Sequence, residues 1–195
     1  PTPVVTVSEP RGYKTSAFTV TLACTNALAE IRYTLDGSVP GTNSPLVTGP
    51  LTVSRTTTLR AAVVDPATVR QNVTTVTWLF LEDILHQGTA PPSGWPSSYE
   101  VNSHVMEYGM RQEIVTGDVA RLRSGMTNAI PSISLVTDLA HLFSAQSGIY
   151  VNPGNDGIAW ERPVSVELID PVRGGWSEFQ IDAGLRIRGA YSRSS

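Results

Sequence analysis

Hydrophobic and polar residues alternate with a period of two along the first 80 positions. In residues 17–24, the side chains of Phe18, Val20, Leu22 and Cys24 fall on one side, with threonine and alanine on the other. Such alternation is typical of a β-strand with one buried face. Similar runs recur over residues 30–35, 50–54, 57–65 and 73–80. Short strands separated by turn residues predict an Ig-like antiparallel β-sandwich over residues 1–80.

Turn signals separate these strands. Asp36-Gly37 follows a strand whose inward positions include Leu35, and it predicts a tight turn. In that turn we expect Asp36 to accept backbone N–H bonds and Gly37 to adopt a positive φ. A calcium or sugar ligand role for Asp36 is the alternative, but no acidic cluster accompanies it. Gly12 and Lys14 predict an earlier turn.

Residues 81–130 differ in character and predict a connector. A short helix is expected over residues 81–87, and the stretch that follows is rich in proline, serine and glycine. A longer helix is expected within residues 109–130, with Thr116 or Asp118 as its cap.

Residues 131–195 mix strand and helix signals and predict a truncated α+β portion. In the strand expected around residue 165, Val164, Val166 and Leu168 share the inward face. The expected elements are a strand over 131–138, a helical turn over 138–143 capped by Thr137 or Asp138, a short strand and turn over 148–157, and strands over 160–170 and 179–187.

Composition and charge exclude some functions. The 195 residues carry a formal net charge of −3, which argues against general nucleic-acid binding and against a polybasic membrane surface. No apolar run reaches the length of about 18 residues that a membrane span needs. The one cysteine, Cys24, cannot form an internal disulfide, and we expect it to be buried. The chain starts at Pro1 and is expected to be a piece of a longer polypeptide.

The last segment carries the clearest chemical signal. Arg186 and Arg188 are two positions apart on a predicted strand, Gly189 allows the backbone to approach an anion closely, and Arg193 adds a further donor. Paired arginines with glycine suit phosphate recognition. A strand with an exposed arginine face is the alternative.

Two tryptophans are candidates for carbohydrate stacking. Trp95 and Trp176 lie in glycine-containing loops, whereas Trp78 lies in an apolar strand and is expected in the core. The three histidines have no metal-ligand spacing among themselves, so the sequence predicts neither a metal site nor a catalytic residue.

The segment AEIRYTLDGSVPGTNSPLVTGPLTVSRTTTLRAAVV (29–64) resembles the chitobiase/β-hexosaminidase C-terminal type of β-sandwich module. The shared features are the IRYTLDGSVP hairpin, the TGP turn and a strand that contains LRA. The resemblance covers about residues 3–80 and implies a non-catalytic module.

Residues 131–195 resemble the start of the CotH family of spore-coat-type kinases. The segments that carry this resemblance are IPSISLVTD (130–138), GIYVNP (148–153), WERPVSVELID (160–170) and FQIDAGLRIRGAYSRSS (179–195). It implies the first strands of a kinase-like domain, with Arg186, Arg188, Gly189 and Arg193 at a nucleotide-facing edge. The family's later lysine and acidic metal ligands would follow Ser195, so ATP and a divalent metal are implied for a longer parent protein and no cofactor for this chain.

These observations predict a non-catalytic fragment of a large secreted or surface bacterial protein. In this interpretation residues 1–80 form a spacer or interaction module, residues 81–130 a connector and residues 131–195 the truncated kinase-like start. The expected partners are other domains of the parent or another protein. One alternative is that the parent is an ATP-dependent extracellular protein kinase. The other is that the chain is a carbohydrate-binding accessory module.

Overall fold

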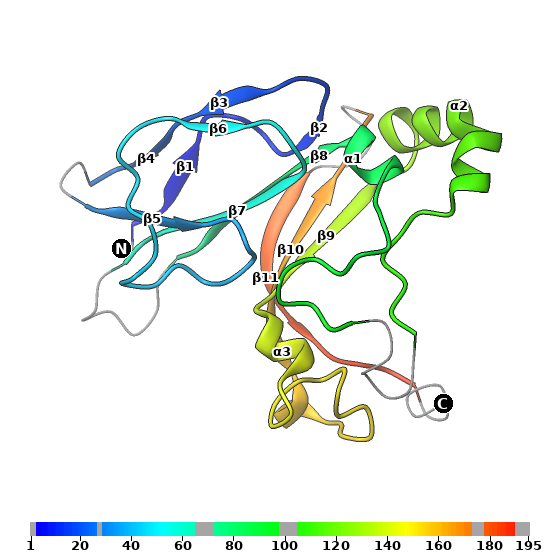
Figure 1. The fold of residues 1–195 in the computed structure, drawn as a ribbon. Helices are drawn as coiled ribbons and strands as arrows, with labels where there is room; N and C mark the ends of the chain where they lie inside the picture. Colours follow the sequence, from blue (N-terminus) through cyan, green and yellow to red (C-terminus); the bar gives the residue numbers. More distant parts are fainter. Residues whose placement is uncertain (1–2, 27–28, 65–71, 98–104, 173–177, 190–195) are drawn as a thin grey trace.

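The computed structural model describes residues 3–26, 29–64, 72–97, 105–172 and 178–189, and it is mainly β (Figure 1). Strands β1–β8 form a sandwich near the N-terminus, and strands β9–β11 form a second sheet. The sandwich strands are β1 (Val5–Val7), β2 (Gly12–Lys14), β3 (Phe18–Val20), β4 (Leu22–Cys24), β5 (Ile31–Thr34), β6 (Leu51–Val53), β7 (Thr57–Val63) and β8 (Thr74–Phe80).

The sandwich has two layers around a hydrophobic core. One layer is a four-stranded sheet of order β2-β8-β7-β5, and the other consists of the pairs β1-β4 and β3-β6. The inward residues of β7 and β8 include Leu59 and Trp78, which are both fully buried. The indole Nε1 of Trp78 donates a hydrogen bond to the carbonyl of Pro10 at 3.0 Å. The predicted sandwich and the predicted core position of Trp78 are therefore confirmed. The core residues are Val20, Val53, Leu59, Val76, Trp78 and Phe80.

The predicted turn at Gly12 and Lys14 is wrong, because residues 12–14 form strand β2. This strand pairs in parallel with the end of β8, with Gly12 opposite Trp78, so the sandwich is not antiparallel throughout. Three residues are too few to show a periodic pattern, and their pairing depends on a strand more than 60 positions away.

The run from Phe18 to Cys24 is divided between two strands. The alternation is present, but β3 pairs with β6 whereas β4 pairs with β1. The chain changes partner at Thr21, whose backbone carbonyl and N–H bond to Ser8. Cys24 is half-buried at the end of β4, which corrects the expected burial.

The turn after β5 forms as predicted. Asp36 Oδ1 accepts hydrogen bonds from the backbone N–H of Ser38 at 3.0 Å and from its hydroxyl at 2.6 Å. These bonds lower the pKa of Asp36. Gly37 adopts a φ of 85°. Leu35, expected to point inward, is 54% exposed because β5 ends at Thr34 and the turn begins there.

The connector contains two helices, α1 (Leu81–Leu85) and α2 (Gln112–Asn128). Neither Thr116 nor Asp118 caps the start of α2, which corrects the prediction. The helix begins before both residues, and Thr116 Oγ1 donates to the carbonyl of Gln112 at 2.8 Å. Asp118 has non-helical backbone angles and marks a kink within α2. None of the described helices has the length and apolar character that a membrane span requires.

The second sheet has the order β11-β10-β9, and both of its pairings are antiparallel. Its strands are β9 (Ser132–Val136), β10 (Arg162–Ile169) and β11 (Phe179–Leu185), and the short helix α3 (Leu139–Phe143) and a 3-10 turn (Ile158–Trp160) lie between β9 and β10. The short strand expected within residues 148–157 is wrong, because turns occupy this segment. Asp138 immediately precedes α3 but makes no capping hydrogen bond to it.

The second sheet buries its polar face, which reverses the expected orientation of β10. Ser165, Glu167 and Ile169 are buried, whereas Val166 and Leu168 are only half-buried. The register places Ser134 of β9 and Gln180 of β11 opposite Glu167, on the same polar face. This face lies against the outer side of the sandwich, where β8 crosses the second sheet.

Candidate functional site

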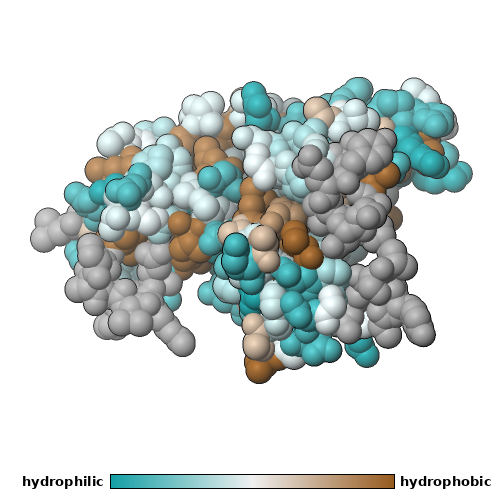
Figure 2. Space-filling model, turned by 60° about the horizontal axis from the view of Figure 1, so that its bottom comes forward, coloured by the Kyte–Doolittle hydropathy of each residue, from teal (hydrophilic) through white to brown (hydrophobic). Residues whose placement is uncertain are grey.

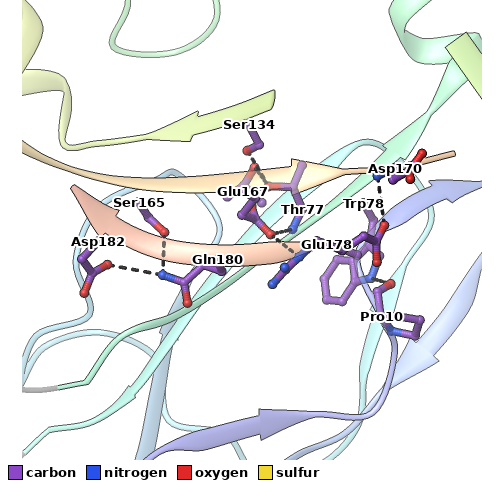
Figure 3. A network of polar contacts seen from close by, with 12 residues as sticks. Pro10, Thr77, Trp78, Ser134, Ser165, Glu167, Asp170, Glu178, Gln180 and Asp182 are labelled. Atoms are coloured by element: carbon purple, nitrogen blue, oxygen red, sulfur yellow. Dashed lines mark hydrogen bonds and ion pairs between the residues drawn. The ribbon is translucent and has the colours of Figure 1, made fainter. Parts of the chain in front are cut away.

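Glu167 is the central residue of the contact between the sandwich and the second sheet. Its carboxylate is fully buried and accepts hydrogen bonds from Thr77 Oγ1 at 2.5 Å and from the Thr77 backbone N–H at 3.1 Å. Arg11 Nε donates to the same carboxylate at 3.1 Å. Figure 3 shows Glu167, Thr77 and Ser134 close together where β8 crosses the second sheet. We call this contact the polar joint.

Further hydrogen bonds extend the polar joint on both sides of Glu167. Ser134 Oγ lies 2.8 Å from Thr77 Oγ1, and Ser132 Oγ lies 3.0 Å from the hydroxyl of Tyr13. Each bond joins β9 to a sandwich strand. The joint is therefore a network of polar contacts rather than one ion pair.

A second group of contacts lies near the turn after β5. Asp138 Oδ1 accepts a hydrogen bond from the backbone N–H of Val39 at 3.0 Å and lies 3.8 Å from Arg60 Nη1. Arg60 is buried on the outer side of β7, and its Nη1 donates to the carbonyl of Gly37 at 2.8 Å. Asp138 thus connects the second sheet to the sandwich instead of capping α3.

Burial changes the acid–base properties of the joint. It raises the pKa of Glu167, although the hydrogen bonds from Thr77 and the charge of Arg11 oppose this effect. It also lowers the pKa of Arg60, against the attraction of Asp138 and Asp182. A buried carboxylate with three donors is held in one orientation, so the joint fixes the two sheets relative to each other.

Sequence reasoning missed the polar joint. The hydrophobic positions of β10 indicated the wrong inward face, because Glu167 and Ser165 alternate with valine and leucine. The one available signal was the polar outer face of β8, where Thr75 and Thr77 alternate with Val76 and are themselves buried. A strand that is buried on both sides implies a second layer.

A cleft of about 580 Å³ opens at one end of the polar joint. Its walls include Arg11 and Lys14 from the sandwich and Asp170 and Glu178 from the second sheet. Lys14 forms an ion pair with Glu9 at 3.1 Å. The mixture of both charges gives this cleft no clear preference for an anion or a cation.

Three of the four residues predicted to bind phosphate line another cleft, of about 530 Å³. These are Arg186, Arg188 and Gly189, and they follow β11, which ends at Leu185 rather than continuing through them. We call this cleft the arginine cleft. Its lining also includes Gly157 and Trp160. Arg193 lies outside the described residues.

The two arginines of this cleft differ in their surroundings. Arg186 Nε forms an ion pair with Glu161 at 3.2 Å. The Glu161 side chain packs over Gly184, so a larger residue at this position would have to displace the Glu161 carboxylate from its place beside Arg186. No ion pair of Arg188 is present among the described residues, and its side chain is exposed. Arg188 is thus the better placed of the two to meet an anion from solvent.

Trp95 belongs to an aromatic cluster beside α3. Its ring meets Phe143 edge-on at a centroid distance of 5.4 Å and Tyr108 at 6.1 Å, and Phe143 in turn meets Tyr150 at 5.9 Å. The side chain is 38% exposed, so part of one ring remains open to solvent. Trp176 lies outside the described residues, and a shared surface of the two tryptophans stays a prediction. Within the described ranges, no three His, Cys, Asp or Glu side chains gather to hold a metal.

Comparison with protein families gives a match that lies within the sandwich. Residues 9–75 match the chitobiase/beta-hexosaminidase C-terminal domain, and this supports the resemblance stated for the sandwich. The matched range ends before the second sheet, so the resemblance of residues 131–195 to the CotH family stays a prediction. No curated protein matches the chain.

Proposed function

We propose that this chain is a non-catalytic accessory unit of a larger secreted or surface bacterial protein, in which the sandwich is a rigid spacer for the domain that begins with the second sheet. The polar joint is the observation that carries this proposal. A flexible tether would need no buried contact between the two sheets, yet Glu167 is fully buried and bonded to Thr77 and Arg11. The match of residues 9–75 to an accessory type of domain supports the same role.

Rotational motion in solution tests the spacer role. In ¹⁵N relaxation measurements on the full chain, backbone amides of β7 and β10 should report one common correlation time. In Glu167→Ala the amides of β7 should keep the correlation time of the folded sandwich, whereas those of β10 should report shorter times, because Thr77 and Arg11 lose their shared acceptor and the second sheet is no longer held in place. Glu113→Ala, at an exposed position of α2, is the matched control and should leave them equal. Different correlation times in the unmodified chain would contradict the proposal.

A second candidate function rests on the arginine cleft. Here the parent protein would be an ATP-dependent kinase, and the cleft would hold a phosphate of the nucleotide. Exposed Arg188 and Gly189, with a φ of 141°, suit a phosphate. A divalent metal fits less well, because the described residues bring no group of three carboxylate, histidine or cysteine ligands together. Phosphoryl transfer is therefore expected only of a longer chain.

Binding of phosphate at the arginine cleft tests this candidate. In NMR titrations with inorganic phosphate or ATP, Arg188→Ala should weaken binding about tenfold or more, the effect of one charge-assisted hydrogen bond. Arg121→Ala, on the exposed face of α2, is the control and should change nothing. The affinity should also fall with added salt. Equal affinities for the unmodified chain and Arg188→Ala would reject the candidate.

The third candidate, binding of carbohydrate, rests on the partly exposed ring of Trp95. Sugar rings pack on exposed aromatic faces, and the neighbours Tyr108 and Phe143 hold this ring in place. Tryptophan fluorescence should then respond to chito-oligosaccharides, and Trp95→Ala should abolish the response. An unchanged spectrum at millimolar sugar would leave Trp95 with a packing role alone.

A further inference from the structure

Glu161 faces Arg186 across the ends of two paired strands, beside the arginine cleft. Strand β10 begins at Arg162, which lies opposite Leu185 at the end of β11. One position further out, the same register sets Glu161 opposite Arg186. The Glu161 carboxylate lies 3.2 Å from Arg186 Nε. The antiparallel register thus brings a carboxylate of the chain itself to one of the two arginines of the cleft.

Gly184 provides the space in which the Glu161 side chain lies. It precedes Arg186 by two positions, and Gly184, Arg186 and Arg188 are all exposed whereas the residues between them are half-buried. An added Cβ atom at Gly184 would overlap with the carboxyl group of Glu161. The absence of a side chain at this position therefore allows the carboxylate to lie over β11 and to reach Arg186.

The charges at the arginine cleft balance one another. Arg186 and Arg188 contribute two positive charges to its lining, whereas Asp156 in the lining and Glu161 beside Arg186 contribute two negative charges. The loop between α3 and β10 lies at the bottom of Figure 1 and comes forward in the lower part of Figure 2, where hydrophilic residues predominate. With this balance, the attraction of the cleft for an anion is much smaller than its two arginines alone would give.

The ion pair between Glu161 and Arg186 is accessible to a competing anion. The side chain of Arg186 is 51% exposed and that of Glu161 is 35% exposed. Ion pairs with this much contact with water contribute little stability. A phosphate group offers a guanidinium two charge-assisted hydrogen bonds in a matching geometry. Phosphate can therefore replace the carboxylate on Arg186.

We propose that Glu161 is an internal counter-ion that sets the affinity of the arginine cleft, and that a phosphate group binds there by displacing the Glu161 carboxylate from Arg186. This inference rests on the phosphate-binding candidate described above. In the bound state both Arg186 and Arg188 contact the phosphate, and the Glu161 side chain turns to solvent. Glu161 is thus a residue that tunes binding through Arg186 without touching the ligand.

NMR titration of the full chain with inorganic phosphate, at constant ionic strength, tests the proposal. Glu161→Gln should bind phosphate about two- to fivefold more tightly, because Arg186 is then released from an exposed ion pair. In the Arg186→Ala background the same substitution should bring no gain, since Glu161 acts through Arg186. Glu113→Gln, at an exposed site of α2, removes the same charge and should leave the affinity unchanged.

A parallel titration with ATP distinguishes the source of the phosphate group. An equal gain for both probes in Glu161→Gln supports recognition of the phosphate alone, and tighter binding of ATP throughout the series supports added contacts to the rest of a nucleotide. Both results agree with the role of Glu161.

Two results would overturn the role of Glu161 while the phosphate-binding candidate stands. The first is an unchanged affinity in Glu161→Gln although Arg188→Ala weakens binding. The second is an equal gain from Glu161→Gln with and without Arg186, which would show a general effect of charge. If neither the unmodified chain nor Glu161→Gln binds phosphate, this inference and the phosphate-binding candidate both fail.

Discussion

At the residue scale, Glu167 shows how one buried carboxylate connects two layers of strands. It accepts hydrogen bonds from Thr77 and forms a hydrogen-bonded ion pair with Arg11, and both partners belong to the sandwich. Removal of a single partner from such a contact leaves a buried charge without compensation. The residue is therefore expected to be important for the joint and to add little to the core of either sheet.

The raised pKa of Glu167 predicts a specific dependence of stability on pH. The ordinary value is 4.5, and burial raises the pKa in the folded state, so the folded chain binds this proton more tightly than the unfolded chain. The contribution of Glu167 to the free energy of unfolding is therefore fully present below about pH 4.5. It is lost as the pH rises through the raised pKa.

Urea unfolding of Glu167→Gln between pH 4 and pH 8 checks this prediction. The glutamine keeps the shape of the side chain but does not titrate. The free energy of unfolding of the variant should therefore not fall as the pH rises through the pKa of Glu167. As the pH rises, the free energy of unfolding of the unmodified chain should thus fall relative to that of the variant. Glu113→Gln, at an exposed site, should follow the unmodified profile. Parallel profiles for Glu167→Gln and the unmodified chain would show that Glu167 titrates normally.

At the element scale, β7 and β8 carry two different surfaces. Their inward residues, including Leu59 and Trp78, form the sandwich core. Their outward residues, including Arg60 and Thr77, are also buried because the second sheet covers them. These two strands are the longest of the sandwich. They contribute both to its core and to the contact with the second sheet.

A pair of leucine substitutions distinguishes the core from the turn. Leu59→Ala should lower the free energy of unfolding by about 2–5 kcal/mol, because Leu59 is fully buried and its removal leaves a cavity. Leu35→Ala should cost less than about 1 kcal/mol, since its side chain is 54% exposed after the end of β5. Chemical denaturation of both variants measures the two values. Similar losses would mean that the turn packs more tightly than its exposure indicates.

At the scale of the whole molecule, the two sheets depend on each other unequally. The sandwich has its own hydrophobic core. The second sheet has its polar face against the sandwich and its apolar face largely open, and its two edge strands pair only with β10 among the described residues. Its stability therefore depends on the polar joint.

Separate expression of the two parts tests this dependence. Residues 1–82 should fold alone and melt cooperatively, whereas residues 105–189 should lack a cooperative melt, since Glu167 and Asp138 lose their sandwich partners. Circular dichroism melts and amide dispersion in NMR spectra measure both outcomes. A cooperative melt of residues 105–189 alone would show that the joint is not needed for folding of the second sheet.

The amino-acid sequence by itself determined the elements that depend on local patterns. Alternation placed most sandwich strands, the Asp36-Gly37 dipeptide placed the turn after β5, and the apolar surroundings of Trp78 placed it in the core. These features follow from residues within a few positions of one another, so a single sequence contains the information that they need.

The tertiary structure alone decided which face of the second sheet is buried, that Gly12–Lys14 is a strand, and that Arg186 meets Glu161 while Arg188 does not. In β10 the valine–leucine face and the serine–glutamate face alternate with the same period, and periodicity does not tell which of them faces protein. Donors on Arg11 and Thr77, far away in the sequence, compensate the burial of the Glu167 carboxylate. That compensation arises only when the two sheets meet, because an isolated carboxylate prefers water by a large free energy.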